Sequence, residues 1–99
     1  MAKGGYTYIV SNPRRTTLYI GMTSNLYNRI YEHKYGHGSK FTSSYNCIDL
    51  VYYEFHEHLE TAIKREKQLK KWKRSYKHNL IASFNPEWRD LFDEVKDFQ

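Results

Sequence analysis

The sequence predicts an α+β domain in which helices flank a small, mainly antiparallel sheet of three strands. Two short β-type segments come first, then a helical segment, a third β-type segment and a long region with helical spacing of its apolar residues. The chain has 99 residues, which is enough for one domain. An aromatic content of 17% with only two prolines argues against disorder. The expected element order is therefore β-β-α-β-α-α.

The first two strands are expected to form a hairpin. Tyr6–Val10 and Leu18–Met22 are rich in β-branched and aromatic residues, and residues 11–16 between them include the turn formers Ser, Asn and Pro. Alternation along the first strand places Tyr8 on the same face as Val10. Gly21, near the end of the second strand, predicts a bend or a close approach by another group.

A short helix and the third strand are expected next. Thr23-Ser24-Asn25 resembles a helix N-cap, and the following helix should run from about Leu26 to Lys34. Glycines after this helix predict a loop that reaches Asn46. Ile48–Phe55 has the strongest strand composition in the chain.

A long helix is expected from about Leu59, with a break or bend near residues 74–76. It should stop before Asn85-Pro86, because proline disfavours helix in the preceding residue. Pro86 can open a short final helix through Leu91. These limits define a single domain over residues 5–91, followed by a short acidic tail at 92–99.

Charge indicates the class of partner. The formal net charge is +5, which is typical of small proteins that contact phosphate groups. The sequence has no apolar stretch long enough to span a membrane and no signal-peptide pattern, so we expect a cytoplasmic protein without a membrane partner. The single cysteine, Cys47, is expected to be a buried apolar residue in a reducing compartment.

Glu66 interrupts the apolar pattern of the long helix. It follows Ala62 and Ile63 and precedes Leu69 at a position where the helical period calls for an apolar residue. A buried carboxylate is costly unless a cation, a metal ion or a proton neutralises it. A salt bridge with Lys70 or Lys73 at the edge of the stripe is the simpler interpretation.

Basic side chains are concentrated on the same helix. The segment 64–77 contains half of the chain's sixteen lysines and arginines and a single acid, Glu66. Such a one-sided distribution favours contact with a phosphate backbone. These candidate nucleic-acid-binding residues are Lys64, Arg65, Lys67, Lys70, Lys71, Lys73, Arg74 and Lys77.

Histidine spacing raises a second metal hypothesis. His33 and His37 are four residues apart, and His56 and His58 flank an acid. The chain has no HExxH motif and no cysteine pair, so zinc is the less favoured interpretation.

Five polar residues have no evident structural role: Tyr8, Tyr19, Arg29, His33 and Glu66. Tyrosine and histidine can exchange protons, arginine can hold an anion, and a carboxylate can bind a hard cation such as Mg²⁺. Hydrolysis of a phosphodiester requires this combination of groups. Each residue also has a structural alternative, as a strand aromatic, a surface charge or a cation near a helix C-terminus.

The spacing of these residues resembles that of the GIY-YIG nuclease superfamily. Tyr19-Ile20-Gly21 is preceded by Tyr6-Thr7-Tyr8 and followed by Arg29 and His33, and the run 62–72, Lys77, Leu80-Ile81 and Asn85-Pro86 also fit. The similarity covers about residues 5–91 and is greatest with the small stand-alone bacterial branch of the family. Tyr6 and Thr7 replace the glycine and isoleucine of the first motif, as is common in this branch.

The resemblance implies Mg²⁺-dependent cleavage of DNA, with Mn²⁺ as an alternative ion, and a role in DNA repair, recombination or processing. It implies that Tyr8 and Tyr19 are the motif tyrosines and that Arg29 stabilises the phosphate. It assigns His33 to proton transfer or a phosphate contact and Glu66 to the metal, with Asn85 supporting the site. Either tyrosine can be the base, directly or through His33.

Two other functions remain open from the sequence. A nucleic-acid-binding module without cleavage activity would use the same basic helix and exposed tyrosines. A protein-interaction domain would need no affinity for DNA. We expect a monomer whose substrate is DNA, with RNA not excluded because a surface that reads the backbone serves both. A protein partner could supply substrate specificity.

Overall fold

The computed structural model describes residues 4–36 and 38–98. Three strands form one antiparallel sheet in the order β2-β1-β3, with β1 in the centre. The strands are β1 (Gly5–Ser11), β2 (Leu18–Thr23) and β3 (Asp49–His56). The α+β class and the antiparallel three-stranded sheet predicted from the sequence are confirmed.

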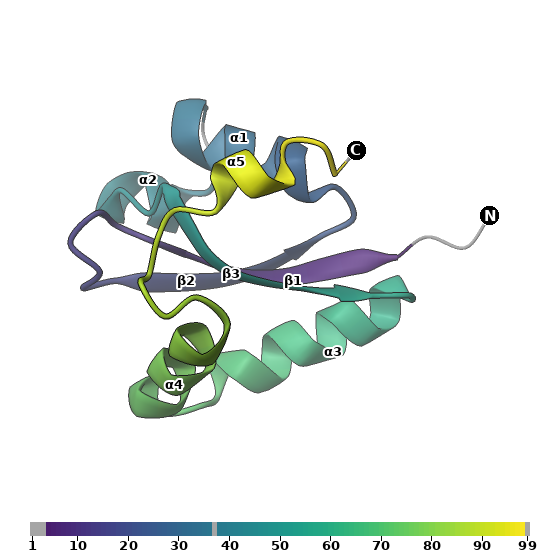
Figure 1. Ribbon diagram of the computed structural model, residues 1–99. Coiled ribbons are helices and arrows are strands. Elements are labelled where there is room, and N and C mark those ends of the chain that lie inside the picture. Colours follow the sequence, from purple (N-terminus) through teal and green to yellow (C-terminus); the bar gives the residue numbers. More distant parts are fainter. Residues whose placement is uncertain (1–3, 37, 99) are drawn as a thin grey trace.

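Helices cover both faces of the sheet (Figure 1). The helices are α1 (Leu26–Tyr35), α2 (Lys40–Tyr45), α3 (Leu59–Lys70), α4 (Arg74–Phe84) and α5 (Phe92–Val95). Figure 1 shows α1, α2 and α5 on one face of the sheet and α3 and α4 on the other. Two of them, α2 and α5, were not expected as helices.

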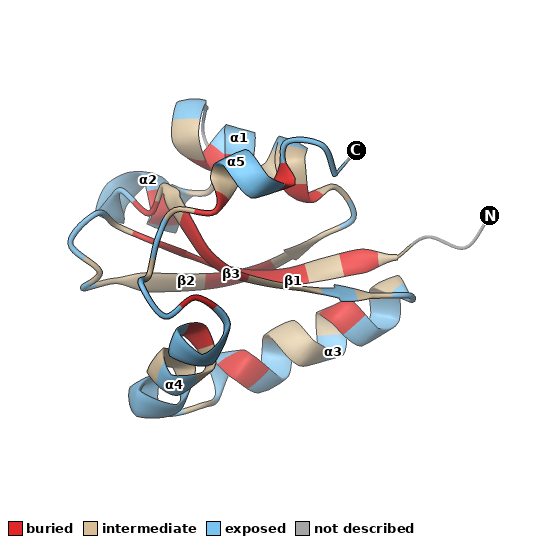
Figure 2. Cartoon of the chain, in the orientation of Figure 1, coloured by how far each residue is buried: buried red, intermediate tan, exposed pale blue. Residues whose placement is uncertain are grey.

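The core consists of two apolar layers, one on each face of the sheet (Figure 2). Tyr8 and Val10 face α1, whereas Ile9 between them faces α3 and α4, as strand alternation requires. The first layer contains Tyr8, Val10, Leu26, Ile30, Cys47, Leu50, Leu91 and Val95. The second contains Ile9, Ile20, Val51, Tyr52, Leu69 and Ile81.

The α3 helix packs closely on β1 because small residues meet there. Ala62 is fully buried, and a Cβ on Gly5 would lie 2.8 Å from the side chain of Leu59. The Thr7 hydroxyl donates a hydrogen bond of 2.9 Å to the Ala62 carbonyl oxygen. This contact ties the helix that carries Glu66 to the central strand.

The break in the long helical region lies at Lys71–Lys73, just before the expected position. Lys73 has an extended backbone (φ −61°, ψ 150°) and is the N-cap of α4. The following helix ends at Phe84, directly before Asn85-Pro86, as predicted.

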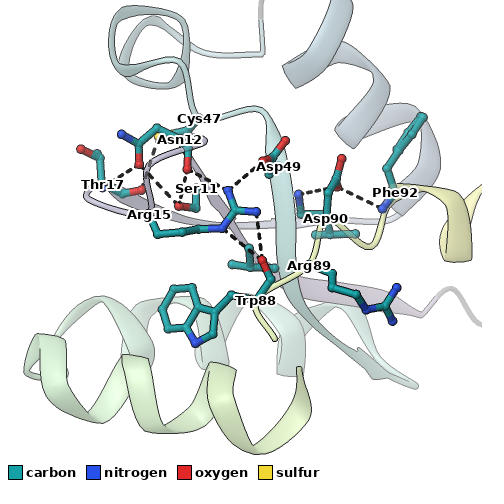
Figure 3. A network of polar contacts seen from close by, with 12 residues as sticks. Ser11, Asn12, Arg15, Thr17, Cys47, Asp49, Trp88, Arg89, Asp90 and Phe92 are labelled. Carbon is teal, nitrogen blue, oxygen red and sulfur yellow. Dashed lines mark hydrogen bonds and ion pairs between the residues drawn. The ribbon is translucent and has the colours of Figure 1, made fainter. Parts of the chain in front are cut away.

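Residues 86–91 form a turn and an extended segment in place of the expected helix. Trp88 has a positive φ of 54°, which no helix accommodates. Its carbonyl oxygen accepts hydrogen bonds of 2.9 and 3.2 Å from the Arg15 guanidinium, which also binds Asp49 (Figure 3). These contacts hold the segment against the β1–β2 loop and the start of β3.

Residues 92–98, where the charge pattern suggested a tail, pack onto the domain. Val95 of α5 is fully buried in the same layer as Leu26 and Ile30. Phe92 stacks on Tyr27 of α1 with ring centroids 5.4 Å apart. The acidic side chains Asp93, Glu94 and Asp97 lie on exposed positions of this segment.

Candidate active site

A buried tyrosine forms the centre of the candidate site. Tyr8 on β1 is 1% exposed, and its hydroxyl lies 2.9 Å from His33 Nε2. Arg29 Nε donates a second hydrogen bond of 3.3 Å to the same oxygen. Gly21 on β2 lies opposite Tyr8, and a Cβ there would be 2.5 Å from the Tyr8 hydroxyl. The close approach predicted at Gly21 is therefore confirmed.

The α1 helix positions Arg29 and His33 on one side. The two residues are one turn apart, and the helix is anchored by its buried residues Leu26 and Ile30. Asn25 caps the N-terminus by accepting a hydrogen bond from the Asn28 backbone N–H. This rigid support aims both side chains at Tyr8.

The His33 ring is enclosed on several sides. Its Nδ1 lies 3.1 Å from the Thr42 hydroxyl on α2. A Cβ on Gly38 would lie 2.1 Å from Nδ1, so only glycine fits beside the ring. The Tyr19 ring packs edge-on with its centroid 5.9 Å from that of His33.

Burial changes the acidity of both central groups. Desolvation raises the pKa of Tyr8 to about 12, although the Arg29 charge and hydrogen bond act in the opposite direction. Burial, reinforced by the Arg29 charge, lowers the pKa of His33 to about 4. At neutral pH the tyrosine is therefore protonated and the histidine is uncharged.

Arg29 retains hydrogen-bonding capacity for an anion. One N–H of its guanidinium binds Tyr8 and another binds Glu32 Oε1 at 2.9 Å. A guanidinium has five N–H donors, so three remain after these contacts among the described residues. Its side chain is 27% exposed, which gives a phosphate access to it.

Glu66 on α3 is close enough to this group for its charge to contribute to the raised pKa of Tyr8, after the larger effect of burial. Its side chain is 18% exposed, and Lys70 Nζ lies 3.4 Å from its carboxylate. The salt-bridge interpretation is thus confirmed as a contact. Because Lys70 is half-exposed and the pair is long, this bridge leaves carboxylate oxygens available for another cation.

The donor set fits a hard cation better than zinc. Among residues 4–36 and 38–98, no three His, Cys, Asp or Glu side chains gather into a metal site. Glu66 would be a lone carboxylate ligand, an arrangement that Mg²⁺ accepts because it keeps several waters and binds substrate phosphate. Both ring nitrogens of His33 face hydroxyl groups, and His56 contacts Glu54. His37 lies outside the described residues.

Tyr19 begins a row of aromatic rings that leads away from the site. Its ring lies 5.7 Å from that of Phe41, which lies 4.7 Å from that of Tyr45 on the next turn of α2. Phe41 and Tyr45 are 42% and 55% exposed. Lys70 Nζ lies 6.0 Å from the Tyr19 ring centroid.

The structure does not bring Asn85 to this group. Its side-chain amide donates to the Val51 carbonyl at 3.1 Å and to the Arg89 carbonyl at 2.8 Å. Its oxygen accepts from the Arg89 backbone N–H at 3.1 Å. Val51 belongs to β3, and β1 separates that strand from β2. In this position Asn85 supports the turn that follows α4.

Some of the basic residues of 64–77 make contacts within the fold, and others are exposed. Arg65 binds Glu54 at 2.7 Å and stacks on Trp72, so its guanidinium is used within the fold. Arg74 donates to the Thr16 carbonyl oxygen at 2.6 Å. Lys77 is half-buried. The exposed lysines are Lys64, Lys67, Lys70, Lys71 and Lys73.

Two residues of the site were missed from the sequence because residues 36–46 resembled a loop. Thr42 lies on α2, which Ser39 caps in a reciprocal arrangement with Thr42. The Ser-x-x-Thr spacing is a variant of the capping box and could have indicated this helix. The same helix carries Phe41, whose ring lies beside that of Tyr19, so recognising the helix could also have indicated Phe41.

Together β1 with Tyr8, the helix that carries Arg29 and His33, and the carboxylate on α3 form a small α+β domain with a cluster of groups that can exchange protons and bind anions. The family model described as the GIY-YIG catalytic domain matches residues 4–79. The chain therefore belongs to the GIY-YIG family, part of a nuclease superfamily, and the family assignment from the sequence is confirmed.

Curated relatives support this assignment over most of the chain. UPF0213 protein CPE1444 of Clostridium perfringens is 41% identical over 78 residues, which cover 79% of this chain and 83% of the relative. A UPF0213 protein of Syntrophus aciditrophicus is 41% identical over 83 residues, covering 83% and 93%. UPF0213 protein NP_0776A of Natronomonas pharaonis is 35% identical over 82 residues, covering 83% and 95%.

No solved structure matches the chain significantly. Within the described part of the chain, every helix is too short or too polar to cross a bilayer.

Proposed function

We propose that this protein is a Mg²⁺-dependent endonuclease that hydrolyses DNA phosphodiester bonds. The observation that carries the proposal is the convergence of Tyr8, His33 and Arg29 beside the carboxylate of Glu66. These side chains come from three separate elements, β1, α1 and α3, and they supply a proton acceptor, an anion-binding group and a hard-cation ligand.

In the proposed reaction, Tyr8 and His33 remove the proton from the attacking water. The Tyr8 oxygen accepts the water proton while its own proton passes to His33 Nε2, 2.9 Å away. This transfer avoids a tyrosinate, which the raised pKa of Tyr8 makes costly. The low pKa of His33 opposes its protonation, and the negative charge of a bound phosphate would offset that effect. Tyr19 packs against the His33 ring and limits its movement.

Arg29 is proposed to bind the scissile phosphate through its remaining N–H donors. Charge on the non-bridging oxygens increases as water attacks, so donors already in place stabilise the transition state more than the ground state. Glu66 would hold Mg²⁺, or Mn²⁺ in its place. The ion would add Lewis-acid stabilisation of the phosphate charge.

Duplex or branched DNA would contact the exposed lysines of α3. Lys64 and Lys67 lie three residues apart on the exposed side of α3, and Lys71 follows directly after the helix. Lys70 contacts Glu66. Such contacts act on the phosphate backbone, with no readout of sequence. The proposed activity suits DNA repair, recombination or processing in the cytoplasm, with a protein partner selecting the substrate.

A cleavage assay tests this function. The purified protein is incubated with duplex, branched and single-stranded DNA, and with RNA, in Mg²⁺, Mn²⁺ or chelator. We expect metal-dependent products that disappear in Glu66→Gln and persist in Glu60→Gln, a carboxylate at an exposed position of the same helix. Full metal-dependent cleavage by Glu66→Gln would refute the assignment of Glu66.

A nucleic-acid-binding module is the second candidate, favoured by the exposed rings of Phe41 and Tyr45 next to Tyr19. Aromatic rings beside lysines bind bases and backbone without chemistry. Salt-sensitive binding without products, in any metal, would favour this function.

A further inference from the structure

The Thr42 hydroxyl occupies a well-defined place between His33 and the start of α2. Its oxygen lies 3.1 Å from His33 Nδ1 and 2.9 Å from the Ser39 hydroxyl oxygen. It also lies 3.0 Å from the Ser39 backbone nitrogen and 3.2 Å from the Ser39 carbonyl oxygen. Thr42 is only 1% exposed, so these hydrogen bonds are made within the protein, and counting donors and acceptors limits their arrangement.

The count at Thr42 leaves two arrangements open. The Ser39 N–H can only donate, so it takes one lone pair of the Thr42 oxygen. If the Ser39 hydroxyl donates to the second lone pair, the Thr42 proton can go to His33 Nδ1. If the Thr42 proton goes instead to the Ser39 hydroxyl or carbonyl oxygen, the second lone pair can accept from a protonated Nδ1.

The count at the other end of the ring decides between these two arrangements. Arg29 Nε can only donate to the Tyr8 oxygen. The Tyr8 hydroxyl proton needs an acceptor, and His33 Nε2 is the one bonded to it among the described residues. His33 Nε2 therefore has no proton of its own. Both ends are satisfied by one tautomer, with the proton on Nδ1.

We propose that Thr42 is a positioning residue that holds His33 in the Nδ1–H tautomer, so that Nε2 accepts the proton of Tyr8. The opposite tautomer would direct Nε2–H at the Tyr8 oxygen and leave the Tyr8 proton without that acceptor. Gly38 contributes space, because any larger side chain there would displace the ring from Thr42. The tautomer itself depends only on geometry, whereas its importance for catalysis depends on the proposed function.

Nitrogen NMR of the wild-type protein tests the tautomer without DNA. Long-range proton–nitrogen spectra of protein labelled in its five histidines distinguish protonated from unprotonated ring nitrogens at neutral pH. The His33 signals are identified by their loss in His33→Gln. We expect Nδ1 protonated and Nε2 unprotonated. A proton on Nε2 in the wild-type protein would overturn the proposal.

Three variants distinguish the effect of the Thr42 hydroxyl on His33 from the effect of the α2 N-terminal cap. Thr42→Val keeps the shape but removes the acceptor, and Thr42→Ser keeps the hydroxyl. Ser39→Ala removes the hydroxyl that caps the Thr42 backbone N–H and that contacts the Thr42 oxygen, but it keeps the Thr42 oxygen as an acceptor for Nδ1. We expect Thr42→Val to shift the proton toward Nε2, whereas Thr42→Ser and Ser39→Ala keep the wild-type tautomer. An unchanged tautomer in folded Thr42→Val would overturn the proposal.

Kinetics then measure the consequence for cleavage. We expect kcat to fall on the order of 100-fold in Thr42→Val, with little change in KM, and to recover in Thr42→Ser. If no variant or wild-type protein cleaves DNA, the proposed function fails while the NMR result still decides the tautomer. A shifted tautomer with unchanged kcat would refute the catalytic importance of Thr42.

Discussion

The two edges of the sheet both carry buried polar side chains, but they use them in opposite ways. Near the β3 edge, Arg15 of the β1–β2 loop binds Asp49 and donates twice to the Trp88 carbonyl oxygen (Figure 3). Asn85 donates to the carbonyl oxygens of Val51 and Arg89. At the β2 edge, Arg29 keeps N–H donors that no described residue uses, and the Glu66 carboxylate has a long contact to Lys70 as its ion pair within residues 4–36 and 38–98. The polar residues of one edge complete the fold, and those of the other retain capacity for a ligand.

The difference teaches that burial of a polar residue is not by itself a sign of function. Asn85 is as buried as His33, with 4% and 5% exposed. Asn85 joins backbone groups of two segments, whereas His33 joins two side-chain hydroxyls. A substitution at the β3 edge should therefore change stability, and one at the β2 edge should change chemistry.

Glu66→Gln should have the largest effect. Loss of the carboxylate removes the proposed metal ligand. We expect the activation free energy of cleavage to rise by about 4 kcal/mol, which lowers the cleavage rate roughly 10³-fold. The free energy of unfolding should change by less than about 0.5 kcal/mol, because the contact with Lys70 is long and partly exposed. Single-turnover cleavage rates and urea unfolding measure the two quantities, with Glu60→Gln as the control.

Arg29→Lys should have the second-largest effect on the cleavage rate. Lysine keeps the positive charge but cannot reproduce the Nε bond to Tyr8 together with a planar contact to phosphate. We expect the cleavage rate to fall roughly 100-fold, measured with saturating DNA. Arg14→Lys, at an exposed position in the β1–β2 loop, should retain the wild-type rate.

Asn85→Ala should lower the stability of the fold and leave the cleavage rate nearly unchanged, the opposite of the result expected for Glu66→Gln. It leaves the Val51 and Arg89 backbone groups without their side-chain partner, so we expect a loss of about 2 kcal/mol in urea unfolding. The cleavage rate of the folded fraction should stay within about twofold of wild type, because Asn85 touches no group of the site. Asn79→Ala on the exposed face of α4 is the matched control. A folded Asn85→Ala protein that cleaves 100-fold more slowly would contradict this division.

The smallest effect concerns His33 and pH. Its pKa of about 4 lies below the ordinary value of 6.5, so the unfolded chain binds a proton first as pH falls. The stability that His33 contributes is complete above pH 6.5 and is lost as pH falls toward 4. After allowance for solvent screening, we expect this pH-dependent contribution of His33 to the free energy of unfolding to be about 1 kcal/mol. The slope of unfolding free energy against pH should be shallower in His33→Gln, and equal slopes would refute the shifted pKa.

Much of the fold could be predicted because periodicity and turn chemistry are local. Alternation in β1 placed Tyr8 and Ile9 on opposite faces correctly, and Asn85-Pro86 marked the end of α4. The turn at Trp88 could not be predicted, because its positive φ is stabilised by Arg15, which is far away in the sequence.

The candidate site was predictable in its members but not in its arrangement. Glu66 interrupts an apolar stripe, and Gly21 interrupts a strand, so both were visible as exceptions to local patterns. The contact between Thr42 and His33 was not, because it depends on how α2 folds back onto α1. For the same reason Asn85 was grouped with the site, although its partners lie at the other edge of the sheet.

Paired measurement of Glu66→Gln and Asn85→Ala tests the contrast between the two edges most directly. Cleavage rate and unfolding free energy are determined for both variants in the same buffer with Mg²⁺. We expect Glu66→Gln to lose cleavage and keep its stability, and Asn85→Ala to lose stability and keep its cleavage rate. Full cleavage by Glu66→Gln, or equal losses of both quantities in both variants, would contradict the division between the two edges.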